Sequence, residues 1–289
     1  MLSTAKPVFS PNSQQLELEK CSIPISNSVS LNVYSNTKPH NLKIANLQKG
    51  LILVCNGTEK VGEGAGFGFP VLVCPEETYF SGSAIVSLSK TSRATMVRKE
   101  FLMDRISRNK LGNTRLENRQ ARAFIKSLCG LYQKNKRFRF LPLNEFIARM
   151  GVETTFRETE SAGKIPITYI IRGNTVEIRV DLSQVKRKNQ KRIFILNEQS
   201  ASFFRKYSDS KKTTLFDGQI DAWNEVNCEN ASLTDFRGQF GFRVYQVAGA
   251  VLRRGRETMR NCLDWVGLDY ELYPNVEFFE YRIRLLGVK

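Results

Sequence analysis

The segment IPITYIIRGNTVEIRVDL, residues 165–182, decides the fold class of this chain. Its second half alternates apolar and polar residues, as a half-buried strand does. The apolar positions of that alternation are Val176, Ile178, Val180 and Leu182. The Gly-Asn dipeptide at 173–174 is typical of a tight turn between two strands. The segment therefore predicts an antiparallel β-hairpin with one buried face.

Strand signals of the same kind occur on both sides of this hairpin. Residues 51–55 form a continuous apolar run, typical of a strand buried on both faces, and Asn56-Gly57 follows as a turn. Further strands are predicted at residues 29–34, 69–74, 78–82, 193–196, 240–247 and 277–286. Strands joined by short turns, without regular β-α-β alternation, favour an antiparallel β-sandwich.

The hydrophobic period changes in the middle of the chain. Across residues 116–134 the apolar residues recur at spacings of three and four, which predicts an amphipathic helix. A shorter pattern at Val97, Phe101 and Ile106 predicts another helix, and residues 143–150 a third. We therefore expect a mainly β protein, an antiparallel β-sandwich with a basic helical insertion; the alternative is an α+β fold with helices on one sheet face.

The predicted organisation has four parts. They are an N-terminal tail at residues 1–20, a β segment at 21–92, the basic helical insertion at 93–151 and a second β segment at 152–289. The two β segments are expected to form one β domain.

Positive charge is concentrated in the insertion. Residues 93–140 contain 14 Lys or Arg against 3 Asp or Glu, a net of +11, whereas the whole chain carries +16. On the predicted helix the cationic residues recur at steps of four, three and four and share one face; they are Arg115, Arg119, Arg122 and Lys126. Such a ridge suits the phosphates of a nucleic acid or the carboxylates and sulfates of an acidic polymer. A solvated face with no partner explains the same pattern.

A glycine-rich run, VGEGAGFGFP at residues 61–70, is the most distinctive local feature. It is not a dinucleotide fingerprint, because a strand and not a helix is predicted to follow it. We interpret it as backbone held in conformations open only to glycine, or as backbone passing close to another chain segment or a ligand. Glu63 lies on this run, and we expect Tyr79 of the following strand to lie near it.

Carboxylates and aromatic residues occur together in two later segments. One contains Asp221 and Trp223, and the other contains Asp264, Trp265, Asp269, Tyr270, Glu271 and Tyr273. Sugar-binding sites use this mixture, because a flat ring packs on the apolar face of a sugar and carboxylates accept hydroxyl hydrogen bonds. Glu198, directly after the strand at 193–196, adds a further carboxylate at a strand end.

Other chemistry finds little support in the composition. The six cysteines are widely spaced with no C-x-x-C pair, and the single histidine, His40, has no nearby cysteine, so neither a metal site nor any other cofactor is expected. Residues 1–19 lack an apolar leader, and the longest apolar run, residues 51–55, is too short to cross a bilayer. We expect a soluble, cytoplasmic protein without a membrane partner.

The leading functional hypothesis is binding of a carbohydrate, neutral or acidic, with its processing left open. The expected catalytic residues are Glu63, Glu198 and Tyr79. The expected ligand contacts are Trp223 and Trp265 as stacking platforms, Asp221 and Asp264 as hydroxyl acceptors, and Arg115, Arg119, Arg122 and Lys126 as anion contacts. Two alternatives are a nucleic-acid-binding protein that uses the basic helix and an assembly protein that docks on an acidic partner. The oligomeric state is left open.

Overall fold

The structure is a computed structural model of the 289-residue chain. It describes residues 14–15, 20–34, 47–75, 77–111, 127, 152–186, 192–215, 220–259 and 263–288. The elements formed by these residues are all β-strands, 22 in number, and every pairing between them is antiparallel. The prediction of a mainly β, antiparallel protein is therefore confirmed.

The largest sheet has ten strands in the order β1-β8-β9-β12-β13-β22-β19-β18-β15-β16. Their bounds are β1 Gln14–Gln15, β8 Ser83–Lys90, β9 Thr95–Leu102, β12 Lys164–Arg172, β13 Thr175–Asp181, β22 Phe278–Leu286, β19 Gly241–Tyr245, β18 Asn230–Thr234, β15 Lys206–Asp209 and β16 Thr213–Leu215. The sheet thus takes strands from both sides of the middle of the chain, where residues 112–126 and 128–151 lie outside the described ranges.

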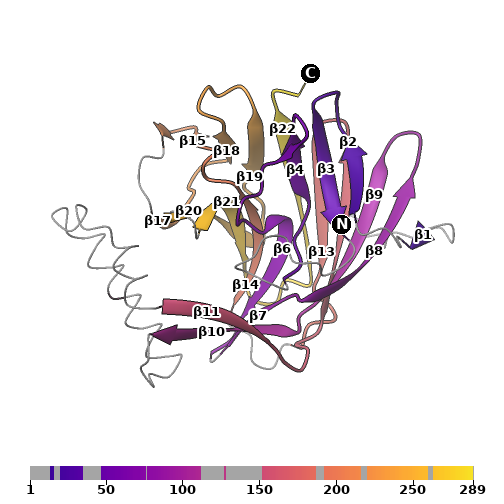
Figure 1. The fold of residues 1–289 in the computed structure, drawn as a ribbon, viewed down its shortest axis with the longest axis vertical. Helices are drawn as coiled ribbons and strands as arrows, with labels where there is room; N and C mark the ends of the chain where they lie inside the picture. Colours follow the sequence, from indigo (N-terminus) through magenta and orange to yellow (C-terminus); the bar gives the residue numbers. More distant parts are fainter. Residues whose placement is uncertain are drawn as a thin grey trace.

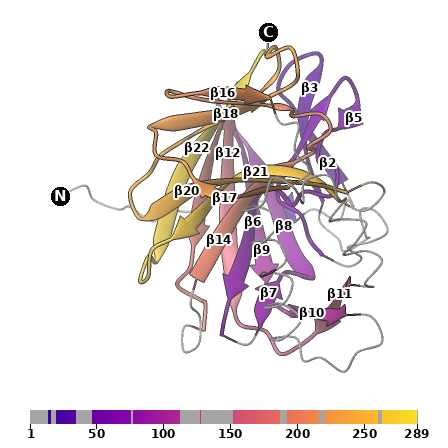
Figure 2. The same cartoon turned by 90° about the vertical axis from the view of Figure 1, so that its left-hand side faces the viewer.

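The second sheet has eight strands in the order β11-β10-β7-β6-β14-β21-β20-β17. Their bounds are β11 Val152–Glu158, β10 Arg105–Leu111, β7 Thr78–Phe80, β6 Gly66–Val73, β14 Arg192–Gln199, β21 Leu263–Leu272, β20 Ala250–Met259 and β17 Ile220–Glu225. A four-stranded sheet contains β2 Lys20–Pro24, β3 Val29–Tyr34, β4 Ile52–Cys55 and β5 Thr58–Glu59. In both views β10 and β11 lie at one end of the molecule and β18 at the other (Figures 1 and 2).

The hydrophobic core lies between the two larger sheets. Phe67 of β6 packs edge-on against Phe242 of β19, with ring centroids 5.0 Å apart. The ring centroids of Tyr270 in β21 and Tyr281 in β22 are 4.6 Å apart. Strand β22 shows why these sequences form strands: Phe279, Tyr281, Ile283 and Leu285 are buried, and the residues between them are exposed. In β13 the predicted apolar face is confirmed, since its apolar positions are at most 2% exposed; the polar face is half-buried, and Glu177 on it is buried as well.

The predicted hairpins are confirmed. Strand β12 pairs with β13 across residues 173–174, and β6 pairs with β7 through Leu72↔Tyr79 and Val73↔Thr78. The turn between β4 and β5 places Asn56 at φ 50° and Gly57 at φ 72°, the left-handed conformation that an Asn-Gly hairpin turn requires.

The helix predicted around Val97, Phe101 and Ile106 is wrong. Val97 and Phe101 lie in β9 and Ile106 lies in β10, and all three side chains are buried. A spacing of four satisfies a strand as well as a helix, because every second residue of a strand shares one face. The predicted basic insertion therefore begins with two strands, and the helices predicted at residues 116–134 and 143–150 lie outside the described residues apart from Ser127.

Candidate functional site

The glycine-rich run crosses the ends of β14 and β21 at very close range. A Cβ atom added to Gly64 would lie 2.8 Å from the main-chain carbonyl of Glu198, and one added to Gly62 would lie 2.5 Å from the main-chain oxygen of Asp264. Gly66 and Gly68 adopt φ angles of 78° and 76°, which side chains rarely tolerate. The run is therefore glycine-rich both for its backbone conformation and for its close approach to the neighbouring strands. We name residues 61–66 the glycine loop.

Two buried carboxyl groups lie beneath this loop. Glu198 of β14 is paired with Gly267 of β21, so the two positions share a face of the sheet, and Asp269 follows on that face two residues later. Asp269 Oδ2 and Glu198 Cγ lie 2.6 and 2.9 Å from the position that a Cβ of residue 267 would occupy. Only a glycine at 267 leaves room for both side chains.

Burial shifts the ionisation of both acids. Loss of hydration raises the pKa of Glu198 to about 7, although a hydrogen bond from the Ala65 amide to Oε2, 3.1 Å, and the charge of Lys49 oppose the change. The same loss of hydration, together with repulsion from Glu198, raises the pKa of Asp269 well above its ordinary value. Glu198 keeps 8% of its residue surface exposed and Asp269 none, so both are buried and Glu198 lies nearer to the surface.

Lys49 anchors the glycine loop. Its Nζ donates hydrogen bonds to the main-chain oxygens of Gly62, 3.2 Å, and Gly64, 2.9 Å. Burial lowers the pKa of Lys49, and attraction to the carboxylates of Glu63 and Glu198 opposes that change. Lys49 is thus a buried cation that the carboxylates of Glu63, Glu198 and Glu59 all attract.

A second lysine supports Lys49 from the core. Lys99 of β9 is fully buried, and its Nζ donates hydrogen bonds to the main-chain oxygens of Tyr34, 3.0 Å, and Lys49, 2.7 Å. Its Nζ also lies 5.1 Å from the centre of the Phe101 ring. Burial lowers the pKa of Lys99 to about 7.

Asn197 ties the site to the ten-stranded sheet. A register shift between Leu196 and Asn197 interrupts the pairing of β14 with β6. Asn197 Oδ1 accepts hydrogen bonds from the Gly68 amide, 3.1 Å, and from the Tyr281 hydroxyl, 2.7 Å. Its main-chain amide donates to Asp269. This buried amide side chain therefore fixes the position of the strand end that carries Glu198.

Gln199 is the residue after Glu198 in β14, and its buried side-chain amide, unlike that of Asn197, has no hydrogen-bond partner. Its side chain is fully buried, and neither its Oε1 nor its Nε2 has a hydrogen-bond partner. Asp269 Oδ2 lacks one as well. Buried polar atoms without partners destabilise a fold, and they are rare in native proteins.

The predicted site residues do not all converge. Glu63 is half-buried on the glycine loop, and its amide donates to the main-chain oxygen of Asp264, 3.1 Å. The expectation that Tyr79 lies near Glu63 is wrong: Tyr79 is paired with Leu72, six residues along β6 from Gly66, or roughly 20 Å in a strand. The Tyr79 hydroxyl donates to Glu77, 3.0 Å, and burial together with that carboxylate raises its pKa to about 12.

The acidic and aromatic residues of the later segments take different positions. Asp264 accepts hydrogen bonds of 2.6 Å from the Ser200 hydroxyl and from the Ser202 amide, so it holds the turn after β14. Trp265 is half-buried on β21, and its side chain hydrogen-bonds Glu257 across the pair of strands. Asp221 and Trp223 lie on edge strand β17, and the directions of their side chains are outside what the structure describes.

The predicted basic ridge is not described at all. Arg115, Arg119, Arg122 and Lys126 lie outside the described residues, as does His40. In the described ranges no group of three or more His, Cys, Asp or Glu side chains is placed to hold a metal ion. No helix within them is long and apolar enough to span a membrane. The cysteines at 21, 55, 74 and 228 are free thiols.

Comparison with known proteins assigns no family. No protein-family model matches the chain, and no curated protein is similar to it. Among solved structures, the chain is similar to the Slr1438 protein from Synechocystis sp. PCC 6803, with 10% sequence identity, coverage of 99% of this chain and 100% of that chain, and a TM-score of 0.44. At this TM-score the similarity is too distant to bear on fold or function.

Proposed function

We propose that this protein binds a carbohydrate beside the glycine loop and exchanges a proton with it through Glu198. The observation that carries the proposal is that Glu198 is a buried carboxyl group that accepts a hydrogen bond from the glycine loop, lies beside Asp269 and feels the charge of Lys49. A general acid or base works best when its pKa lies near the working pH, and burial brings Glu198 to about 7.

The neighbouring groups suit a ligand with hydroxyl groups. Glu63 lies on the loop and the Lys49 ammonium holds it, so a carboxylate acceptor and an ammonium donor both act on the surroundings of Glu198. Trp265, two residues before Gly267 on β21, is half-buried. An aromatic surface, a carboxylate and an ammonium group are the contacts that sugars commonly receive.

The proposal is tested by exchanging one atom in Glu198. Purified protein would be screened for hydrolysis of chromogenic glycosides and for interconversion of the anomers of free sugars. Glu198→Gln keeps the shape of the side chain but cannot exchange the proton, so it should lower any turnover by about 100-fold or more. Glu160→Gln, on a carboxylate whose side chain is 89% exposed, is the matched control and should keep the wild-type rate. A folded Glu198→Gln protein with the wild-type rate would remove Glu198 from the proposal.

The alternative functions inferred from the sequence remain proposals that depend on other residues than Glu198. Binding of an acidic sugar, a nucleic acid or an acidic partner protein depends on Arg115, Arg119, Arg122 and Lys126, which lie outside the described residues. A salt titration of binding to labelled DNA and to an acidic polysaccharide, with these four residues changed to Glu, tests them together. DNA binding that weakens steeply with salt and is lost in the variant would favour the nucleic-acid function over the carbohydrate function.

A further inference from the structure

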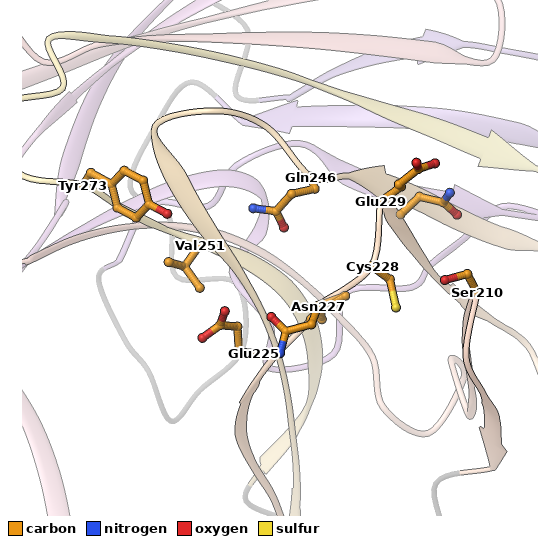
Figure 3. A pocket seen from close by; sticks show the side chains of 10 residues that line it. Ser210, Glu225, Asn227, Cys228, Glu229, Gln246, Val251 and Tyr273 are labelled. Carbon is orange, nitrogen blue, oxygen red and sulfur yellow. The ribbon is translucent and has the colours of Figure 1, made fainter.

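A surface groove lies at the end of β21 that is remote from Glu198. Its volume is about 690 Å³, and its polar lining includes Glu225, Asn227, Glu229, Asn230, Gln246 and Tyr273. Figure 3 shows these side chains as an elongated row, with Tyr273 at one end and Ser210 at the other. The groove draws on five separate parts of the chain: the turn between β15 and β16, the stretch from the end of β17 to the start of β18, the residue after β19, the start of β20 and the residue after β21.

Hydrogen bonds of the main chain hold the walls of the groove in place. The Tyr273 amide donates to Gly249, 2.8 Å, and the Gln246 amide donates to Glu229, 2.7 Å. Gln246 Nε2 donates to the main-chain oxygen of Ala250, 3.0 Å, which fixes the direction of the side-chain amide. A groove with fixed walls loses little entropy when a ligand binds.

The lining chemistry identifies a class of ligand. Tyr273 is 53% exposed, so its ring offers an accessible apolar surface at one end of the groove. Carboxylates and side-chain amides present pairs of hydrogen-bonding atoms, which match neighbouring hydroxyl groups of a sugar. The described lining residues include Glu225 and Glu229 but no Lys or Arg, although the chain carries a net charge of +16. Two carboxylates without a cation disfavour a negatively charged ligand.

This groove is distinct from the region of Glu198. Glu198 is paired with Gly267, whereas Tyr273 directly follows the last residue of β21, Leu272. Six residues of extended strand separate the two positions by roughly 20 Å. One short ligand cannot reach both.

We propose that the groove is a binding site for a neutral oligosaccharide, with Tyr273 as its stacking platform. The site does not depend on the function proposed for Glu198, because its residues and its position are separate. The elongated row of amide and carboxylate groups suits a chain of several sugar units better than a single one.

Binding is tested directly with the full-length protein. An array of neutral, anionic and amine-bearing glycans would be screened, and the affinity for the best neutral oligosaccharide would be measured by calorimetry. Tyr273→Ala should weaken that binding by roughly tenfold or more, because it removes the stacked ring. Phe278→Ala, which removes another exposed ring, 61% accessible, is the matched control and should leave the affinity unchanged.

Several outcomes would overturn the proposal. They are an array without any neutral ligand, equal binding by wild type and Tyr273→Ala, and a preference for anionic glycans or for the polyamine spermidine. Glu198→Gln should keep wild-type affinity in this assay even if it loses turnover. Loss of affinity in that variant would mean that the groove is not a separate site.

Discussion

The Nζ atom of Lys99 donates a hydrogen bond of 2.7 Å to the main-chain oxygen of Lys49, and Lys49 in turn holds the glycine loop. A fully buried lysine of the ten-stranded sheet is thereby connected to the surroundings of Glu198 in the eight-stranded sheet. The surroundings of Glu198, the group that we propose to exchange a proton, are thus stabilised by a lysine of the other large sheet.

The first prediction concerns the pH dependence of stability through Lys99. Its pKa is about 7 in the folded protein, against an ordinary value of 10.5, so the unfolded chain binds more protons between these pH values. The contribution of Lys99 therefore makes the free energy of unfolding rise as pH increases from 7 to about 10. Lys99→Met should remove this rise, as measured by the difference between wild type and variant in urea unfolding at pH 7, 8.5 and 10.

A lysine of the neighbouring strand provides the control. Lys164 of β12 is exposed, and Lys164→Met should leave the pH dependence as it is in the wild type. If the free energies of unfolding of Lys99→Met and wild type change in parallel from pH 7 to pH 10, Lys99 does not titrate near neutral pH.

Glu198 makes stability depend on pH in the opposite direction to Lys99. Its pKa is about 7 in the folded protein against an ordinary value of 4.5, so the folded state binds the extra proton between these pH values. Stability from this group is therefore lost as pH rises from about 4.5 to 7. Glu198→Gln resembles the protonated acid, so it should gain stability relative to wild type at pH 8 and not at pH 4. A difference that stays constant from pH 4 to pH 8 would contradict the raised pKa.

Gly267 is expected to tolerate no side chain. An added Cβ would meet Asp269 Oδ2 at 2.6 Å and Glu198 Cγ at 2.9 Å, both in buried side chains. Gly267→Ala should lower the free energy of unfolding by about 1–3 kcal/mol, the usual cost of overpacking, and should also shift the titration of Glu198. Gly173→Ala, in a turn with no atom within 4 Å of the added Cβ, should leave the Glu198 titration unchanged. Equal titration curves in both variants would show that residue 267 does not position the acid.

Gln199 and Asn197 form a matched pair on β14. Gln199→Met replaces two buried amide atoms that lack partners, so we expect it to raise the free energy of unfolding by about 1 kcal/mol. Asn197→Leu removes an amide that contacts Gly68, Tyr281 and the main chain of Leu268, so it should cost about 2 kcal/mol or more. Thermal unfolding of both variants tests the contrast, and destabilisation by Gln199→Met would show that its amide is satisfied in solution.

Strands whose faces differ in polarity could be predicted from the sequence. In β22 one face is buried and the other exposed, so apolar and polar residues alternate. In β13 apolar and polar residues alternate as well, although its polar face is half-buried and Glu177 on it is buried. In β9 the inward positions are Val97, Lys99 and Phe101, and the buried lysine interrupts the apolar alternation. The remaining spacing of four resembled a helix, and so both the strand and the importance of Lys99 were missed.

The candidate site was predictable only in part. A carboxylate on a glycine-rich run and another at a strand end made Glu63 and Glu198 candidates, and in the structure the charges of both act on Lys49. The pairing of Glu198 with Gly267, which brings Asp269 close, depends on the register between strands that are distant in sequence. Local patterns do not determine such a register. The sequence therefore could not show that Glu198 and Asp269 lie together, or that Tyr79 lies far from Glu63.

The most direct test of the central claim is a carbon-13 NMR titration of the glutamate side-chain carboxyls, with Glu198→Gln used to assign the signal. We predict a Glu198 midpoint near pH 7, and a shift of that midpoint when a bound saccharide contacts the acid. A midpoint near 4.5, unmoved by every saccharide in the panel, would contradict it.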